Sequence, residues 1–568
     1  MIAAVVDPRG REAAESTLRR LCPEWTELRA RGEAVVARTR DAGDECAVRD
    51  ETRLADAARD ARSGAFVALD ADGGALLARG SLGGRPLYYA RTADDGWIAC
   101  SQMAPLVRAA GSRFRPDPDR LASLAAGLAD PRDDATAFAG VSRVPPCAAV
   151  RLVGSRALVH RRPREARTLL DPPVEELAAE LWRRVEGAVR RATEGASRVA
   201  VMVGGGVDSS SLLAAAVAVA RGASTREVHA LALDFDAIGT DRPYLAALAA
   251  ALGIVPVRLA PRDAGPYFTD SLVLDAQPYT LGIGPLERLV FGRARDLGAE
   301  VLLSGYMADE ILAGDLRGLA VEALEGSPLR AARRAMRLRL PWESTPRKRV
   351  EDYVVRPILK PFVPRALLAR NGARGEARLF PWAGARLRRV LAELREQATE
   401  GTAPRSPTER FERFARSVTL ADFADLRGQM EAATGLVRKD PYADEDVLDL
   451  LARVRPEVMC HDDMHRGLFR AAIRGRVPES IRARLDKSYF EPALAEMADA
   501  AGGLSALGDL WTPRALERLS IVDAARFRRA MEPLFRAPAS TSESAELWAL
   551  ATQVIPCEAF ARGFEAGA

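Results

Sequence analysis

The chain has 568 residues, of which 48% are hydrophobic, so it is long enough to bury large cores and to form two or more domains. Its 82 basic and 78 acidic residues give a net charge of +4, and this near balance argues against nucleic acid or a membrane surface as the main partner. The six cysteines are scattered without a C-x-x-C pair, which indicates neither a disulfide framework nor a zinc site. The longest helical apolar run, residues 212–220, is far too short to span a bilayer. We therefore expect a cytoplasmic protein with no membrane anchor and no nucleic-acid partner.

The first 165 residues have the pattern of a β-rich domain. Short runs of strand composition are separated by Gly and Asp turns, at residues 64–70, 75–79, 85–90 and 96–101. We expect these runs to form strands of one domain that covers residues 1–165.

Residues 166–568 change to alternating strands and helices. Four apolar residues at helical spacing, from Leu177 to Val189, lead into a strand at residues 199–203. Helical and strand-like runs then follow in turn, at residues 210–220, 228–235, 243–252, 255–259, 284–297 and 301–304. This alternation predicts an α/β domain, a parallel sheet with helices on both faces and with ligands at the carboxyl ends of its strands. Residues from about 315 to 430 are mostly helical in character, and we expect them to form an insertion.

A glycine-rich turn follows the strand at residues 199–203. It carries Gly204-Gly205-Gly206 and then Asp208-Ser209-Ser210, just before a helix. Glycines permit positive φ and a close approach to an anion, while hydroxyls and the free N–H groups of a new helix donate hydrogen bonds. A carboxylate among these donors indicates a bridging Mg²⁺, which prefers oxygen ligands and substrate phosphates. The alternative is a strand-to-helix turn that binds nothing.

The turn resembles the SGGxDS pyrophosphate loop of the ATP pyrophosphatases, enzymes that cleave ATP to AMP and pyrophosphate. Gly204 stands where that family has its leading Ser, and the Lys-Ser/Thr ending of a Walker A loop is absent. The resemblance implies ATP and Mg²⁺ as cofactors. It also implies a set of cofactor-binding residues: Met202, Val203, Gly204, Gly205, Gly206, Asp208, Ser209, Ser210, Leu233 and Gly305.

Residues 305–310 resemble the second hallmark of asparagine synthetase-like enzymes, a glycine-containing loop that ends in Ser-Asp-Glu, with Ala308 in place of the Ser. By that resemblance Asp309 holds Mg²⁺ together with Asp208. The alternative is a helix N-terminus at which acidic residues complement the helix dipole.

Tyr306 precedes Asp309 by three residues, the spacing of a tyrosine that takes part in amine deprotonation in the β-lactam synthetase branch. The resemblance therefore implies Tyr306 and Glu310 as catalytic residues. Glu343 and Glu351 are weaker candidates for the glutamate that orients the tyrosine. The alternative for Tyr306 is a core position on a buried loop.

Two later segments complete the resemblance. Residues 435–444 resemble a family segment with Arg, Pro-Phe and Asp, and residues 465–487 resemble its C-terminal run, which ends in a catalytic lysine, here Lys487. Only four residues of the chain are Lys, which favours a position that needs a compact ammonium over a surface lysine. The four matches in order identify the chain as similar to asparagine synthetase-like ATP pyrophosphatases, whose synthetase domain has an adenine nucleotide α-hydrolase-like fold.

The N-terminal domain is similar to the glutaminase (Ntn-type) sandwich of asparagine synthetases, on the basis of Arg79 and residues 84–89. In that domain the nucleophile is a Cys directly after the initiator Met, whereas this chain has Ile2. Cys22 and Cys46 have no free α-amino group to act as base. We therefore interpret the domain as a degenerate glutaminase retained as a scaffold.

The resemblance implies an ATP-dependent amide-forming ligase, with three possible reactions. An asparagine synthetase would need free ammonia because of Ile2, and a β-lactam or carbapenam synthetase would cyclise a small amino acid. A lasso peptide cyclase would join an Asp or Glu side chain of a precursor peptide to the N-terminal amine of that peptide, with a leader-binding protein and a leader peptidase as partners. We favour the cyclase because about 175 residues separate Asp309 from Lys487, room for a larger chamber. An inactive scaffold is disfavoured by the intact Asp208, Asp309 and Lys487.

Lys487 gives a first testable prediction. If its ammonium stabilises charge in the transition state, Lys487→Met should lower turnover by about 10²–10³ and leave ATP binding nearly intact. Lys487→Arg should not restore the rate fully, because a planar guanidinium differs in shape. Single-turnover kinetics together with ATP titration measure both effects, and a Met variant of near-normal rate would make Lys487 a surface charge.

Overall fold

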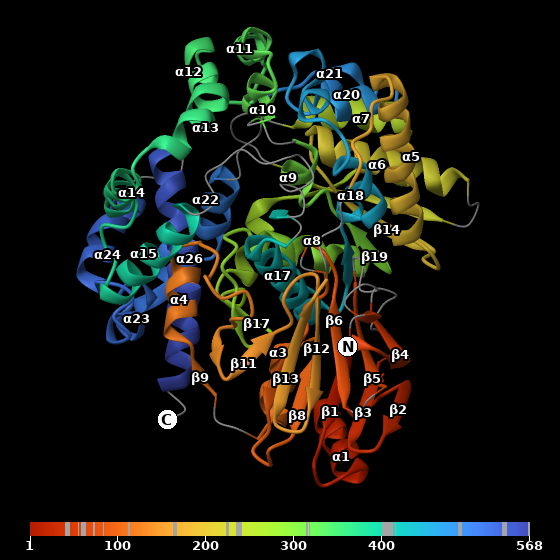
Figure 1. Ribbon diagram of the computed structural model, residues 1–568, viewed down its shortest axis with the longest axis vertical. Coiled ribbons are helices and arrows are strands. Elements are labelled where there is room, and N and C mark those ends of the chain that lie inside the picture. The colour runs from red at the N-terminus through yellow and green to blue at the C-terminus, as the bar shows by residue number, and fades with distance from the viewer. Residues whose placement is uncertain are drawn as a thin grey trace.

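The computed structural model describes residues 1–565 except the following: 40–45, 55, 58–63, 72–73, 83, 112–113, 163–166, 223–225, 235–240, 314–315, 317, 343, 400–412, 415, 487–490 and 537–541. A β-sandwich forms one end of the molecule, and a helix-rich part built around a parallel sheet forms the rest (Figure 1). No helix in these ranges is long and apolar enough to cross a membrane.

The sandwich consists of two sheets that face each other across one apolar layer. The first has the order β11 (Val141–Arg143), β7 (Tyr88–Arg91), β8 (Trp97–Cys100), β1 (Ile2–Val6), β3 (Ala34–Arg38), β2 (Glu27–Arg31). The second has the order β13 (Arg156–Arg161), β12 (Ala148–Val153), β6 (Ala75–Arg79), β5 (Ala65–Asp70), β4 (Cys46–Thr52). Neighbours are antiparallel except β4 and β5. The helices α1 (Arg11–Leu21) and α3 (Met103–Ala109) share a core with the outer side of the first sheet.

Ile2 lies in the apolar layer between these sheets and is fully buried. A side chain in this position packs against both sheets and cannot serve as a nucleophile. The cysteines whose side chains the structure describes are all free thiols, Cys22, Cys100, Cys147, Cys460 and Cys557.

The second sheet system is parallel throughout. Its order is β16 (Val257–Leu259), β15 (Glu227–Leu233), β14 (Arg198–Val203), β19 (Val301–Leu303), β20 (Val437–Lys439). Alternate residues of β14 point to opposite faces: Val199 and Val201 join one core with α5 (Val174–Ala192) and α6 (Val207–Arg221), and Ala200 joins another with α8 (Gly284–Asp296). The predicted α/β class, with helices on both faces of a parallel sheet, is confirmed.

Several predicted boundaries move by a few residues. Helix α6 begins at Val207 rather than at residue 210, so Asp208 and Ser209 belong to its first turn. Strand β16 begins at Val257, since Val255 is 91% exposed and has no neighbouring strand to pack on. Strand β20 was not predicted as a strand at all. Helix α7 (Arg242–Leu252) matches the prediction closely.

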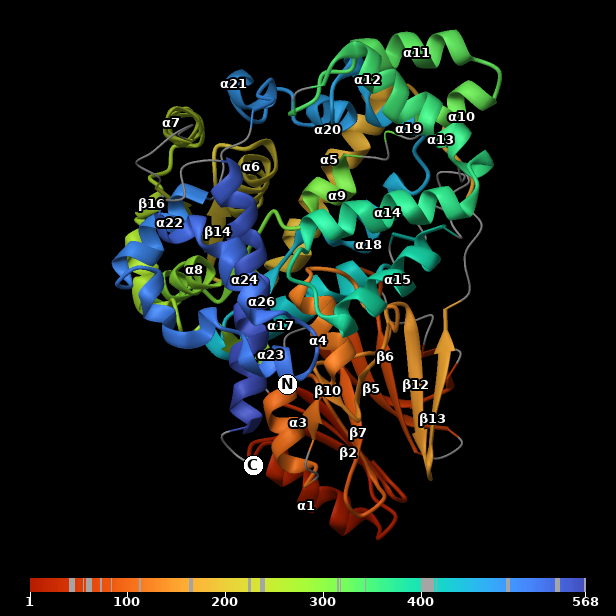
Figure 2. The same cartoon turned by 90° about the vertical axis from the view of Figure 1, so that its left-hand side faces the viewer.

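Helices form most of the remaining chain. After α9 (Ala308–Leu312) come α10 (Gly318–Leu324), α11 (Pro328–Arg337), α12 (Pro346–Val350), η3 (Glu351–Val355), α13 (Arg356–Leu359), η4 (Lys360–Phe362), α14 (Arg365–Leu379), α15 (Ala385–Thr399) and α17 (Val418–Thr434). The C-terminal helices include α18 (Glu445–Leu451), α19 (Pro456–Met459), α20 (Gly467–Ala472), α21 (Glu479–Arg482), α22 (Glu491–Ala500), α23 (Arg514–Arg518), α24 (Ala524–Met531) and α26 (Ser542–Glu565). In both views α10–α13 lie at the end opposite the sandwich, and α26 runs beside α4 (Pro118–Ala125) (Figures 1 and 2).

Helix α17 joins the sandwich to the parallel-sheet part through buried ion pairs. Arg143, whose side chain is fully buried, contacts Asp422 and Asp425 at 2.6 Å each, and Arg79 contacts Asp425 at 2.6 Å. Burial alone would raise the pKa of Asp422, but Arg120 and Arg143 outweigh that effect and hold the pKa below its usual value. The Asp422 carboxylate is therefore charged, and its charge depends on arginines of the sandwich.

We predict that Arg143→Met lowers the stability of the chain by about 3–5 kcal/mol, because it leaves buried carboxylates without a counter-ion. The matched control is Arg183→Met, which removes a 74% exposed arginine from a surface pair with Glu180 and should change stability little. Thermal midpoints and urea titrations measure the difference. Equal effects of the two substitutions would contradict a structural role for the buried pairs.

Candidate functional site

The first two sequence motifs meet at the carboxyl ends of β14 and β19, the adjacent central strands of the parallel sheet. At this point the order of strands along the chain reverses direction, and such a switch point leaves a crevice between the loops that follow the two strands. The crevice is a cavity of about 540 Å³. Its lining includes most of the predicted residues: Met202, Val203, Gly204, Gly206, Asp208, Ser209, Leu233, Gly305, Tyr306, Asp309 and Glu310.

Gly205 and Ser210 of the predicted set are not in this lining. The Gly205 N–H donates to Asp241 at 2.8 Å, and the buried Ser210 hydroxyl donates to the Gly204 carbonyl at 3.0 Å. Glycine is needed here because of close approach and not because of positive φ, which none of the three glycines adopts. A Cβ at Gly205 would lie 2.7 Å from Arg484. Asp241, which also pairs with Arg484 at 2.7 Å, is a site residue that the sequence did not reveal.

The two predicted metal acids are brought together by one arginine. The guanidinium of Arg466, a 4% exposed residue, contacts Asp208 through one nitrogen and Asp309 through another. The other Asp208 oxygen, Oδ1, is buried and accepts no hydrogen bond. The described residues contain no cluster of three or more His, Cys, Asp or Glu side chains suited to a metal. Mg²⁺ prefers oxygen ligands and often takes some of them from substrate phosphates. Two carboxylates, one of which has a buried oxygen that accepts no hydrogen bond, fit such an ion.

Tyr306 lies deeper in the same cavity, between charged and aromatic groups. The Arg438 guanidinium stacks over its ring at 4.6 Å, and Phe423 meets the ring edge to face at 5.9 Å. Burial, and then the nearby Glu287 carboxylate, raise the pKa of Tyr306 well above its usual range, against the opposing effect of Arg438. Tyr306 is therefore a phenol in this site, and any proton that it passes on needs an acceptor.

Glu287 is that acceptor candidate, and the sequence analysis missed it. It sits in the first turn of α8, is 1% exposed, lines the cavity and pairs with Arg438 at 3.0 Å. Burial raises its pKa above the usual value. Of the two glutamates suggested from sequence, Glu343 lies outside the described residues, and Glu351 is exposed on η3 and is not among the residues that line the cavity.

The residues that lead to Lys487 also reach the cavity. Arg484, Leu485 and Asp486 line it, while Lys487 itself lies outside the described residues. Arg484 is held by Asp241 and stacks on Tyr244 at 4.0 Å, so the segment is fixed up to that point.

The remaining wall of the cavity is apolar. Leu281, Ile283, Leu286 and Val290 line it opposite the acidic loop. On the side of α11 and α12, Pro341 and His465 complete the lining, and the half-exposed Trp342 ring packs edge to face on the His465 ring at 5.5 Å. Trp342 itself is not among the residues that line the cavity.

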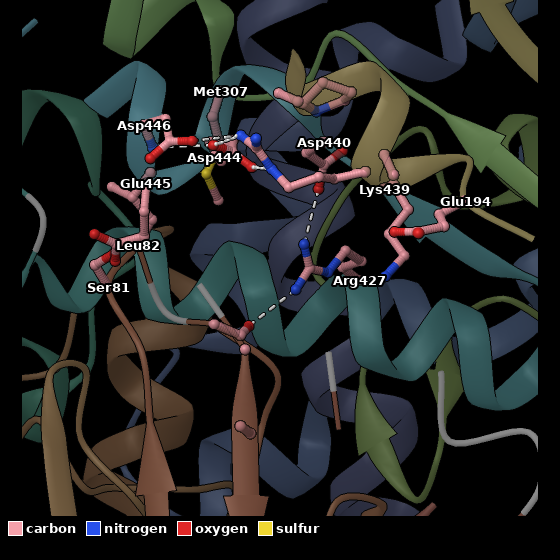
Figure 3. A pocket seen from close by; sticks show the side chains of 18 of the residues that line it. Ser81, Leu82, Glu194, Met307, Arg427, Lys439, Asp440, Asp444, Glu445 and Asp446 are labelled. Atoms are coloured by element: carbon pink, nitrogen blue, oxygen red, sulfur yellow. Dashed lines mark hydrogen bonds and ion pairs between the residues drawn. The ribbon is translucent and has the colours of Figure 1, made fainter. Parts of the chain in front are cut away.

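Figure 3 shows a second cavity of about 820 Å³, between β4 and β5 of the sandwich, the end of α5 and the turn after β20. Its ionic side chains are largely paired with one another, Arg191 with Asp444 at 2.6 Å and Arg427 with Asp440 at 3.0 Å. Met307 lines both cavities and is 6% exposed, with a left-handed φ of 63°. The two cavities therefore meet at Met307, just before the predicted metal acid Asp309.

Comparison with known proteins decides the family. The asparagine synthase family model matches residues 180–561, a span that contains the whole parallel sheet and all of the site residues above. The chain belongs to the asparagine synthase family. Members of this family are ATP-dependent ligases that form amide bonds and release AMP and pyrophosphate, and this chain is such an enzyme. The resemblance predicted from the sequence is confirmed at this level.

Other comparisons add little. A search among curated proteins gave no match. Among solved structures, the U34-tRNA thiolase NcsA from Methanococcus maripaludis, with its [4Fe-4S] cluster, is 15% identical. The match covers 40% of this chain and 80% of that chain, at a TM-score of 0.19, and no inference rests on it.

We predict that Arg466→Ala strengthens binding of a divalent cation in the absence of nucleotide by about tenfold or more, since the cation no longer competes with a guanidinium for both carboxylates. Titration calorimetry with Mn²⁺ measures the affinity. The matched control is Arg474→Ala, which removes an exposed arginine just after α20, the helix that Arg466 precedes. Weaker Mn²⁺ binding in Arg466→Ala would show instead that the arginine supports the cation site.

Proposed function

We propose that this ligase is a lasso peptide cyclase. It activates an Asp or Glu side chain of a precursor peptide with ATP and joins that side chain to the N-terminal amine of the peptide, forming a macrolactam. The observation that carries the proposal is the lining of the 540 Å³ cavity, which includes the apolar residues Leu281, Ile283, Leu286 and Val290 and reaches Pro341 and His465. The half-exposed Trp342 ring packs on the His465 ring outside this lining. An apolar lining with a half-exposed aromatic ring beside it suits a peptide that extends out of the cavity, whereas a small amino acid would end within it.

In the first half-reaction the substrate carboxylate attacks the α-phosphorus of ATP and pyrophosphate leaves. Gly204, Gly206 and Ser209 would bind the phosphates, with Leu233 and Met202 beside the nucleoside. Asp208 and Asp309 would hold Mg²⁺, which offsets the charge of the phosphates when it is bound. Arg466 is next to both carboxylates and would supply a further positive charge to the departing pyrophosphate. Lys487 follows a segment of the lining and would stabilise charge at the reacting acyl group.

In the second half-reaction the amine attacks the acyl-adenylate and loses a proton. Tyr306, a phenol in this site, would take that proton as it passes its own to Glu287, whose raised pKa makes it a better base than an exposed glutamate. Glu310, which is exposed at the mouth of the cavity, would orient the incoming amine. Binding both ends of one peptide makes this step intramolecular, a large gain only if the loop is already threaded.

Two other reactions remain candidates on the same site. A β-lactam or carbapenam synthetase uses the same Tyr306 arrangement on a small amino acid. An ammonia-dependent asparagine synthetase would bypass the sandwich, in which Ile2 is buried in the core. The apolar wall favours neither substrate, because both are small and polar.

The wider assignments belong to the same proposal. Residues 1–165 would be a degenerate glutaminase domain and residues 166–568 the adenylating domain, with the helical segment 315–430 as part of the peptide chamber. A leader-binding protein and a leader peptidase would deliver the precursor in the cytoplasm.

The test is to incubate the chain with ATP, Mg²⁺, a leader-processing partner and a candidate precursor peptide. We expect AMP and pyrophosphate, together with a core peptide that mass spectrometry finds lighter by one water and that resists unthreading. Asp208→Ala, the negative control, should give neither product while it remains folded. Stoichiometric ADP and phosphate would contradict the half-reaction. Cyclisation of a free β-amino acid, or conversion of aspartate with ammonia, would replace the peptide by a small substrate.

A further inference from the structure

Exposed apolar side chains gather on one helical layer, α10–α14, which we call the helical cap (residues 318–379). Of the thirteen large hydrophobic side chains that are exposed in the described part of the chain, nine lie in the cap. They are Leu324, Leu329, Met336, Trp342, Val355, Leu359, Phe362, Leu367 and Leu379. Phe362 is 82% exposed and Leu329 74%, so these side chains project from the surface.

The cap has an apolar interior of its own as well as this apolar exterior. Leu319, Ala331, Ala335 and Val354 form a small core between α10, α11 and η3. Val355, Leu359 and Phe362, spaced by four and three residues along one continuous helical run, form a separate stripe on the outside. The exposed stripe is therefore not needed to hold the cap together.

Basic charge accompanies the exposed apolar residues. The cap contains 14 of the 82 Lys and Arg residues and 6 of the 78 Asp and Glu residues, a net charge of +8, which leaves the rest of the chain at −4. Arg330, Arg337, Arg356 and Lys360 each follow an exposed apolar residue directly and are themselves exposed. The net charge of the whole chain, +4, does not reveal this uneven distribution of basic residues.

We propose that the outer face of the helical cap docks on an anionic lipid surface. A bilayer interface offers acyl chains and anionic headgroups side by side, and it suits a helical surface on which apolar and basic side chains alternate. The core of a protein interface is instead depleted in charged residues, so the alternation favours lipid over a protein partner. The sandwich lies at the end of the molecule opposite α10–α13, with α14 between them (Figure 2), and the net negative charge outside the cap would orient the α10–α13 end toward the membrane.

The docking would place the rim of the catalytic cavity near the bilayer. Pro341, which joins α11 to α12 within the cap, also lines the cavity. Substrate and product would then enter and leave beside the membrane. This inference stands independently of which carboxylate the enzyme activates.

The experiment is co-sedimentation of the full chain with phosphatidylcholine vesicles that contain or lack phosphatidylglycerol. We expect binding to the anionic vesicles only, weakened by raised salt because the basic residues act through screened charge. The double substitution L329S/F362S should lower the partition coefficient by about tenfold or more, since two large apolar side chains no longer leave water. Arg333→Glu with Arg337→Glu should lower it similarly.

Two matched controls separate the cap from the rest of the surface. Val255→Ser replaces a 91% exposed apolar residue outside the cap, and R19E/R183E reverses two arginines whose side chains are each 74% exposed. Both controls should bind as the unmodified chain does. Absence of binding to anionic vesicles, or equal loss in cap and control variants, would overturn the proposal. Loss of a protein partner in the cap variants without any vesicle binding would overturn it in favour of a protein interface.

Discussion

The structure depends on arginines buried against carboxylates at the junction of its two parts. Arg79 and Arg143 of the sandwich pair with acids of α17, while Arg427 of α17 pairs with Asp440 and donates a hydrogen bond to the Gly84 carbonyl of the sandwich. Removing one partner of such a pair leaves a charge that is costly to bury. The sandwich therefore stabilises the parallel-sheet part, because α17 cannot be uncovered without leaving its acids exposed or unpaired.

The buried ion pairs continue from this junction to side chains of the catalytic cavity. Arg438 stacks on Tyr306 and pairs with Asp440, which pairs with Arg427, and Arg427 donates a hydrogen bond to the Gly84 carbonyl of the sandwich. Two ion pairs and one hydrogen bond thus link a tyrosine in the cavity to a domain none of whose described residues line it. Buried ion pairs behind a catalytic side chain hold that side chain within the small range of positions that the reaction requires. The sandwich is thus a structural support for the site.

The sequence was sufficient for the parallel sheet and for the convergence of its first two motifs. Strand and helix patterns identified β14 and β19, and parallel strands end at one edge, so Asp208 and Asp309 were expected to meet. The sequence did not predict β20, because Arg438 and Lys439 give that strand a polar pattern. Arg438 is nevertheless buried, where it pairs with Glu287. Glu287, Asp241 and Arg466 were missed for a related reason. Each pairs with a residue more than a hundred positions away, and the spacing of residues along the chain does not indicate such pairs.

Met307 separates the two large cavities, and at that position the partition is a single residue thick. Water hydrolyses an acyl-adenylate in competition with the amine, so exclusion of water from the side that faces the polar second cavity protects the intermediate. A flexible thioether fills irregular gaps well, and it does so here in a left-handed backbone conformation that a β-branched residue would not readily adopt. Loss of the Met307 side chain would therefore lower the yield of amide more than the rate of its formation, because water from the second cavity would reach the intermediate.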